Sequence, residues 1–469
     1  MRDRELRPEV YLARCQPFYD NDETEDSPVG AALRGIWGAM RLDPNNPFRG
    51  DLAPGGLAVI KPNWVLHDNP SGGGLDCLIT HRSLVYRTAL HCARALEGRG
   101  RIVIGDCPIQ ECDFQALLKK TRIGEIVGRL RRAYPGVEIE IQDWRLTTLP
   151  RVAGKGAGYT PCRQTLHDQA QSLAENYQEL DAGNESFLEG VSEYANRFRV
   201  TMYKPSLMHA HHQPGVHRYL LRKEPLQADL LINLAKMKTH AKAGLTGAMK
   251  NLVGLNGHKE YLPHHVKGSY FTGGDSFFQD NHFAAWAEDV YDLWWEGHNE
   301  RSALGNWLLS HAYQACRAAC RLTGGGRVSP GGWSGNDTVW RMTLDLNHLV
   351  YFGPCQPKRI LNIVDGIIAG EGNGPLKPTA KQAGVILAGE NPAHVDAVIG
   401  RLIGYNIHRI PTVFHAVCHR RSKFGGLAFD RIPVFLLEKG GAAIALDWHK
   451  ISPLGFTPPP NWKRALCLT

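Results

Sequence analysis

The sequence lacks the short motifs that identify several large classes of protein. None of its 11 cysteines stands in a CxxC pair, which argues against a zinc ribbon, a thioredoxin-type redox pair and an iron–sulfur cluster. No GxGxxG follows the first expected strand, and GxxxxGK[ST], HExxH and GxSxG do not occur. These absences argue against a dinucleotide-binding dehydrogenase, a P-loop nucleotidase, an HExxH metalloprotease and an α/β-hydrolase.

Long apolar runs and a strong charge excess are missing as well. No stretch of about 18 uncharged apolar residues occurs, and the first 15 residues lack the apolar core of a signal peptide. We therefore expect a cytoplasmic protein without a membrane partner. The net charge of +8 is small for 469 residues, which argues against a dedicated nucleic-acid binder. The sequence alone leaves the oligomeric state open.

Strand and helix patterns alternate between residues 57 and 144, which predicts parallel βαβ units. Short apolar runs predict strands, and a helix is expected after Thr80 and another from Phe114 to Ala133. The expected strands of this part are 57–60, 101–105 and 137–141. The fold class is therefore α/β, with a Rossmann-like parallel sheet in the N-terminal part.

The rest of the chain predicts a smaller C-terminal α/β part, with a cleft between the two. Its expected strands are 360–364, 385–387 and 434–437, and Pro392 begins a helix that ends at Gly404. We divide the chain into an N-terminal extension, an α/β domain with an elaborated connection at 154–227, a helical, Trp-rich segment with a Gly-rich loop, and the C-terminal part. The corresponding ranges are 1–56, 57–280, 281–335 and 336–469.

The positive charge is concentrated in one segment. Residues 236–267 hold six lysines, four histidines and a single glutamate, so five of the eight net charges lie there. The segment follows a strand expected at 228–234, and its glycines precede a helical turn whose start should present free N–H groups to an anion. Together with two residues at the end of the first strand, it predicts these substrate-binding residues: Lys61, Asn63, Lys236, Lys238, Lys242 and Asn251. The alternative is a solvated basic loop.

Histidines gather in two places that predict ligands for a divalent metal. His209 and His211 form an HxH pattern, and on a strand this spacing would place both rings on one face. His264 and His265 form the second group. The alternative for both groups is a hydrogen-bonding or acid/base role.

Carboxylates follow the strand expected at 360–364. Asp365 precedes the glycine-rich run GIIAGEGNGP and Glu371 lies within it, where they could act as bases or bind a metal. Alternatively, Asp365 caps a turn. With His240 and Lys250 they complete the set of candidate catalytic residues.

Several of these motifs resemble one bacterial protein family. Lys61-Pro62-Asn63, the run INLAKMKTHAKAGLTGAMKNLVG, the segment GNDTVWRMTLDLN and VDGIIAGEGNGP followed by NP and VDA are similar to the family filed as domain of unknown function 362. The resemblance covers most of residues 57–420. Some members carry a ferredoxin-like segment, but this chain lacks its cysteine run.

A more distant likeness concerns the nickel-pincer lactate racemase family. That family also has a strand, a histidine, an AG pair and a small-residue turn that ends in a lysine. The likeness implies that Lys250 would tether the pincer cofactor, and that His265, or less well His264, would bind its nickel. The acid/base histidines of that family have no clear counterpart here.

These observations lead to two hypotheses of function. The first is an enzyme of acid/base, isomerase-like chemistry, with or without a metal, whose partner is a small anionic carboxylate or phosphate. The second is a non-catalytic protein that binds a polyanion or an acidic partner through the basic segment.

Overall fold

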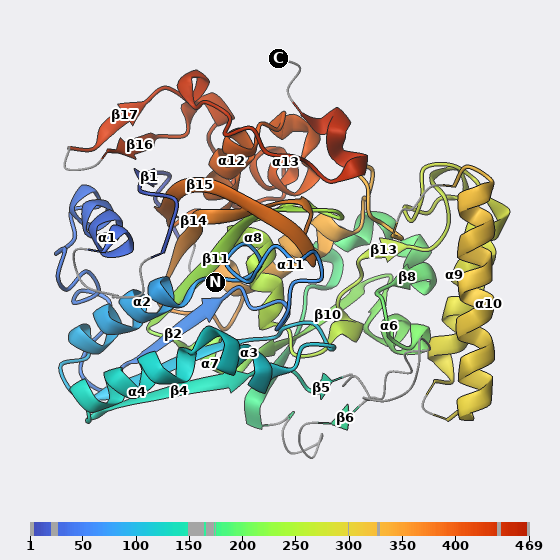
Figure 1. The fold of residues 1–469 in the computed structure, drawn as a ribbon, viewed down its shortest axis with the longest axis horizontal. Helices are drawn as coiled ribbons and strands as arrows, with labels where there is room; N and C mark the ends of the chain where they lie inside the picture. Colours follow the sequence, from blue (N-terminus) through green and yellow to red (C-terminus); the bar gives the residue numbers. More distant parts are fainter. Residues whose placement is uncertain are drawn as a thin grey trace.

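The computed structural model describes residues 4–19, 27–148, 164–165, 173, 175–298, 300–325, 329–438 and 442–466. A single large mixed sheet runs through most of the molecule (Figure 1). In spatial order its strands are β17 (Ile444–Leu446), β16 (Val434–Leu437), β1 (Val10–Arg14), β15 (Lys377–Gly389), β14 (Arg359–Asn373), β11 (Leu230–His240), β2 (Leu57–Pro62), β3 (Gly100–Asp106) and β4 (Val137–Asp143), and β12 (Gly244–Thr246) pairs with β11.

The fold class is α/β, as the sequence predicts. Strands β14, β11, β2, β3 and β4 are mutually parallel, whereas β15 runs antiparallel to both β14 and β1. The strands of the expected N-terminal and C-terminal parts lie in this same sheet, and β11 and β14 are direct neighbours. Strand β1, from the expected N-terminal extension, lies between β15 and β16.

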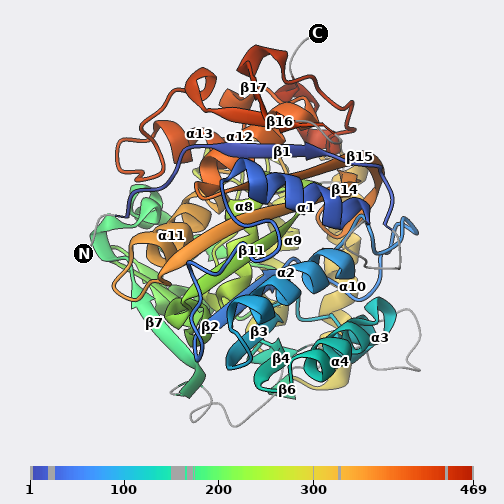
Figure 2. The ribbon, with the colours of Figure 1, turned by 90° about the vertical axis from the view of Figure 1, so that its left-hand side faces the viewer.

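Helices cover both faces of the sheet, so its central strands are buried on both sides. One core packs α1 (Pro28–Ala39), α2 (Arg82–Ala95), α3 (Phe114–Thr121) and α4 (Ile123–Ala133) against alternate strand residues such as Ile60 and Ile232. The other core packs α8 (Ala248–Asn251), α11 (Val339–Phe352), α12 (Pro392–Ile403) and α13 (Pro411–Cys418) against the intervening residues, such as Val59 and Leu231. Figure 2 looks onto the face that α1 and α2 cover.

The remaining elements lie beside this sheet. Short sheets join β7 (Tyr177–Asp181), β10 (Val216–Arg222) and β9 (His212–Gln213), then β8 (Phe198–Arg199) with β13 (His265–Val266), and β5 (Thr147–Thr148) with β6 (Gln164–Thr165). The other helices are α6 (Pro205–His211), α7 (Lys223–Gln227), α9 (His282–Glu296) and α10 (Ala303–Leu322). None of the helices in the described ranges is both long and apolar enough to cross a membrane.

Two local expectations need correction. The helix expected from Phe114 to Ala133 is two helices, α3 and α4, because Arg122 adopts a left-handed conformation with φ of 56° between them. The glycine-rich run after Asp365 is not a loop: β14 continues to Asn373 with a shift in register after Gly366 and pairs with β15 along this extension.

Candidate active site

Polar side chains gather where the parallel strands end. Lys61 and Asp106 lie near the carboxyl ends of β2 and β3, and β11 ends at His240. The segment that follows β12 crosses this edge of the sheet as α8 and the 3-10 helices η3 (Leu252–Leu255) and η4 (Lys259–Tyr261). The arrangement matches the common position of ligand sites in parallel sheets.

Lys236 and Lys238 lie within β11, because this strand extends six residues beyond the expected end at Leu234. The Lys236 ammonium donates to the Asp365 carboxylate at 2.9 Å, and both side chains are fully buried. Tyr19 donates to the same carboxylate and stacks on His81, with ring centroids 3.8 Å apart. These contacts give the Lys236 ammonium and the Asp365 carboxylate hydrogen-bond partners inside the protein.

Lys238 is also fully buried. Its ammonium group donates to the carbonyl oxygen of Leu78. Burial and the neighbouring Lys236 lower the pKa of Lys238 to about 7.

A second buried ion pair joins Lys61 to Asp106, with the Lys61 Nζ 2.6 Å from Oδ1. Asn251 accepts from Asn63 at 2.9 Å and lies 3.3 Å from the same Lys61 ammonium. A Cβ at Gly254 would lie 2.3 Å from Asp106 Oδ1. Only glycine at this position lets η3 approach the ion pair so closely.

The start of α8 is already occupied by an anion from the chain itself. Asp396 accepts hydrogen bonds from the backbone N–H groups of Ala248 and Met249, at 2.6 and 3.0 Å. The expectation that this helix start presents free N–H groups is therefore wrong. Burial raises the pKa of the Asp396 carboxyl to about 7.

Beyond this cap lies a group of cationic and titratable side chains, here called the basic cluster: His240, Lys242, Lys250, Lys259 and His264. Lys250 lies at its centre and interacts electrostatically with each of the other four. Its half-buried amine makes no hydrogen bond or ion pair with any residue that the structure describes. Such a concentration of positive charge, only partly offset by the carboxylates of Asp275 and Glu288, is unfavourable unless protons leave or an anion binds.

The pKa values within the basic cluster reflect this unfavourable concentration of positive charge. Burial, together with Lys259 and Lys242, lowers the pKa of Lys250 to about 7. Burial lowers the pKa of Lys242 to about 8, although Asp275 and Glu288 partly offset the effect. Burial and the lysines hold the pKa values of His240 and His264 well below their usual range, so both rings are neutral at pH 7.

The position of one proton on His240 follows from its neighbours. His240 Nδ1 accepts from the backbone N–H groups of Lys242 and Ala243, at 3.0 and 3.1 Å. In the neutral ring the proton must therefore reside on Nε2.

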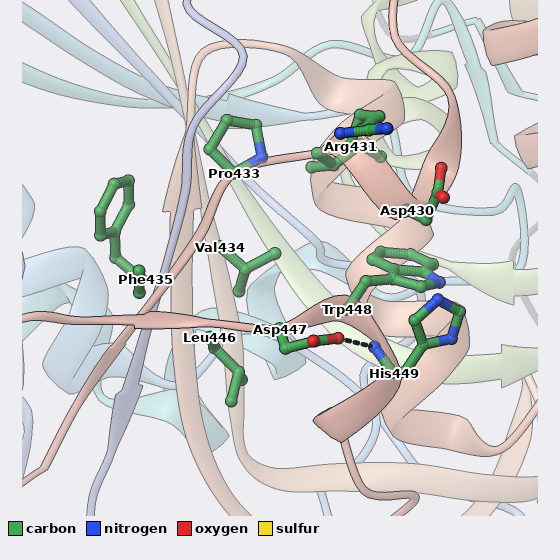
Figure 3. Close-up of a pocket in the computed structure, with 11 residues that line it drawn as sticks. Asp430, Arg431, Pro433, Val434, Phe435, Leu446, Asp447, Trp448 and His449 are labelled. Atoms are coloured by element: carbon green, nitrogen blue, oxygen red, sulfur yellow. Dashed lines mark hydrogen bonds between the residues drawn. The ribbon is translucent and has the colours of Figure 1, made fainter.

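His265 lies between the basic cluster and a surface hollow. Its Nδ1 is 3.4 Å from Lys242 Nζ, and its Nε2 is 4.0 Å from the Glu288 carboxylate. Glu288 lines a hollow of about 360 Å³, together with Arg197, Arg199 and Lys267. Burial raises the pKa of Glu288 to about 7. A second hollow of similar volume, between β16, β17 and Trp448, contains no residue of the basic cluster (Figure 3).

The first histidine group differs from its expected geometry. Residues 205–211 form helix α6, which begins at Pro205, so His209 and His211 do not share a strand face. His209 is exposed, whereas His211 stacks on Tyr261 with ring centroids 3.5 Å apart. Among the described residues, no three His, Cys, Asp or Glu side chains come together to hold a metal ion.

The residues do not fit a nickel-pincer group as the racemase likeness places it. Lys250 has a free amine, but His265, the best-matched nickel ligand, faces Lys242 and Glu288. His264 lies near Lys250, and its Nδ1 is 2.7 Å from the Leu262 carbonyl oxygen.

Glu371 lies apart from these contacts. Its carboxylate accepts from the backbone N–H of Thr457 at 2.7 Å and so ties the β14–β15 extension to the C-terminal segment. Lys259, Glu288 and Asp396 are the site residues that sequence reasoning missed. The count of charges in 236–267 includes Lys259. Asp396, from α12, lies in the VDA motif of the family resemblance, which assigned it no role, and no local pattern marks Glu288, from α9.

Comparison with known families supports one of the two resemblances. Residues 182–401 match the model of the family described as domain of unknown function DUF362. This range contains the entire basic cluster, together with Asp365 and Asp396. No curated protein and no solved structure matches the chain significantly. The likeness to the nickel-pincer racemases is not confirmed.

Proposed function

We propose that this protein is an enzyme that performs acid/base chemistry on a small carboxylate or phosphate at the basic cluster. The observation that carries the proposal is the amine of Lys250, which has no hydrogen-bond partner among the described residues and is surrounded by Lys242, Lys259, His240 and His264. A bound anion would supply the negative charge that this group lacks.

The pKa values suggest a division of roles. Lys242, with a pKa of about 8, holds the anion together with its neighbour Lys259. Lys250, with a pKa of about 7, is partly unprotonated at neutral pH and accepts a proton from the substrate. The Nε2–H of His240 faces no acceptor among the described residues and serves as the hydrogen-bond donor to the charge that develops. Lys61, Asn63 and Asn251 position η3 and α8 beside the anion.

The buried position of the basic cluster favours a small anion over a polyanion. His240 is 7% exposed, and Lys242 and Lys250 are half-buried. A nucleic acid needs lysines that reach its phosphates from the surface, since each neutralised phosphate contributes separately to binding. The same burial excludes bulk water and strengthens electrostatic interactions with a small substrate.

The experiment follows proton exchange rather than a presumed product. The full chain is incubated in D2O with a panel of small 2-hydroxy and amino carboxylates, and deuterium at the α-carbon is measured by NMR. Binding of inorganic phosphate and of each carboxylate is measured in parallel by calorimetry. We expect exchange for at least one carboxylate and its loss in Lys250→Met.

Lys119 is an exposed lysine near the end of α3, and Lys119→Met is the matched control. The control should keep both exchange and binding. The proposal fails if Lys250→Met and Lys242→Met bind phosphate and the carboxylates as the unaltered protein does.

A further inference from the structure

The hollow that Glu288 lines is large enough for a small molecule, and the proposed chemistry does not use it. Its volume of about 360 Å³ lies within the range of about 300–1,000 Å³ that is usual for ligand pockets. Its walls come from the end of the 3-10 helix η2 (Phe187–Arg197), from β8, from the turn after β13 and from α9, which lie together at one side of the molecule (Figure 1). No residue of the basic cluster lines it.

Most of the charges around this hollow neutralise one another. The Lys267 ammonium lies 2.7 Å from the carboxylate of Asp289 and 2.5 Å from that of Asp292. Asp292 also pairs with Arg199 at 2.9 Å. These four residues form one connected network of two cations and two anions, so they leave no net charge.

The other two charged residues of the lining, Arg197 and Glu288, are outside this network. In the described part of the chain, neither has an ionised partner of opposite charge within 4 Å. His265 lies 4.0 Å from the Glu288 carboxylate, but burial and Lys242 hold the pKa of His265 well below its usual range, so its ring is neutral at pH 7. The hollow therefore has one uncompensated cation and one uncompensated carboxylate.

A single peptide group holds both residues in place. The Lys267 carbonyl oxygen accepts from Nε of Arg197 at 3.0 Å and also from its Nη2, whereas the Gly268 N–H donates to Glu288 Oε2 at 2.9 Å. The C=O and N–H of a trans peptide point in opposite directions, so the two charged groups lie on either side of this peptide. A Cβ at Gly268 would clash with the Arg197 guanidinium, and φ of 103° also requires glycine there.

Both charged groups retain the capacity to bind a ligand. Arg197 donates three hydrogen bonds, to the carbonyl oxygens of Lys267 and Thr272, which leaves two of the five N–H groups of its guanidinium without a partner among the described residues. Glu288 accepts one hydrogen bond on each carboxylate oxygen, from Ser276 at 2.5 Å and from Gly268. Each oxygen therefore keeps a lone pair for a further donor.

We propose that the hollow binds a small α-amino acid in its zwitterionic form, with the ammonium group at Glu288 and the carboxylate at Arg197. A guanidinium binds a carboxylate through paired N–H groups, and a buried carboxylate without a counter-ion is stabilised by an ammonium group. A ligand with one charge would leave the other group uncompensated, whereas a zwitterion neutralises both. This site is separate from the basic cluster and does not depend on the function proposed there.

The test measures binding of the proteinogenic amino acids to the full chain at pH 7, first by the rise in Tm and then by calorimetry. We expect at least one small amino acid to bind, and its affinity to fall at least tenfold in Glu288→Gln. Removing either charge of the ligand should have the same effect, so its N-acetyl derivative and its amide should each bind at least tenfold more weakly. The matched control is Asp430→Asn, which removes an exposed carboxylate from the second hollow and should leave binding unchanged.

Three outcomes would overturn the proposal. The first is that no amino acid raises Tm or releases heat. The second is binding that persists in Glu288→Gln but is lost in Lys250→Met, since this would place the amino acid in the basic cluster. The third is binding of the N-acetyl derivative as tight as that of the amino acid itself. Glutamine keeps an oxygen that accepts from Ser276 or Gly268, and circular dichroism verifies that the variant is folded.

Discussion

Lys236 and Asp365 are opposite each other in register on the neighbouring parallel strands β11 and β14, and their side chains form a buried ion pair of 2.9 Å. The two residues are 129 positions apart in the sequence. The pair fixes the alignment of strands from the two halves of the chain. Substituting these two residues therefore tests whether they support the fold or the chemistry.

We expect Lys236→Met to lower the free energy of unfolding by about 3–5 kcal/mol, because it leaves the Asp365 charge buried and unpaired. Urea unfolding measures the change. The double variant K236M/D365L should lose less than the sum of the two single variants. Lys358→Met is the control, since Lys358 is 80% exposed in its pair with Asp229, and it should cost at most about 1 kcal/mol. A cost for Lys236→Met as small as that of the control would contradict the prediction.

Lys250 should make stability rise with pH. The pKa of this lysine is about 7 in the folded protein and near 10.5 in the unfolded chain, so the unfolded chain binds more protons between these values. From pH 7 to pH 9 this one group adds up to about 2.7 kcal/mol to the free energy of unfolding. In Lys250→Met the increase should be smaller by that amount, whereas Lys119→Met should leave it unchanged. Unfolding curves of the unaltered protein and the two variants at pH 7 and pH 9 measure these changes in the free energy of unfolding.

The pKa values of Lys250 and Lys242 predict a narrow pH optimum for the proposed proton exchange. Activity should rise as Lys250 loses its proton near pH 7 and fall as Lys242 loses its charge near pH 8. The measurement is kcat/KM against pH. In Lys242→Arg the guanidinium stays charged, so the alkaline limb should move upward by at least one pH unit. An unmoved alkaline limb would assign it to another group.

Gly254 should tolerate no side chain. A methyl group there would lie 2.3 Å from Asp106 Oδ1 and 2.8 Å from Lys61 Nζ, so either η3 or the ion pair must move. We expect Gly254→Ala to lower the free energy of unfolding by about 1–3 kcal/mol and to weaken anion binding. Gly124→Ala, in α4 with nothing within 4 Å of the new methyl, should be neutral or slightly stabilising. Thermal and urea unfolding of the two variants provide the comparison.

The intact mass of the protein tests our conclusion that His265 is not placed as a ligand of a nickel-pincer group. Since His265 faces Lys242 and Glu288, we expect the purified untagged chain to have the mass of its sequence and no stoichiometric nickel. Mass spectrometry of the Lys250 peptide and elemental analysis are the measurements. Added mass on that peptide together with one nickel per chain would refute our interpretation of His265.

The central strands could be predicted from the sequence because burial on both faces requires nearly continuous apolar runs. Leu57 begins the central strand β2 as expected, and the expected strand Val434–Leu437 matches β16, which lies beside the edge strand β17, residue for residue. The end of β11 could not be predicted, since lysines inside a buried strand are tolerated only with particular partners. For Lys236 that partner is Asp365, and strand register between distant segments is not visible in local patterns.

The location of the basic cluster was predictable in part. The concentration of lysines and histidines in 236–267 identified His240, Lys242, Lys250 and His264, which the structure brings together. The capping of α8 by Asp396 was not predictable, because a carboxylate nearly 150 residues away takes the N–H groups that a local pattern leaves free. The HxH pattern misled for a similar reason: Pro205 starts a helix, and helical spacing separates the two rings.

The position of β1 has a consequence for how the chain folds. Residues 10–14 are synthesised long before their partners in the sheet, which are residues 385–389 and 434–437. Strand β1 must therefore remain unpaired until residues 385–389 have been made, and closing so long a loop slows the search for the native pairing. Until then its apolar edge can pair with other chains. Completion of this sheet is therefore a late event in folding, and β1 needs protection from pairing with other chains until its partners have been made.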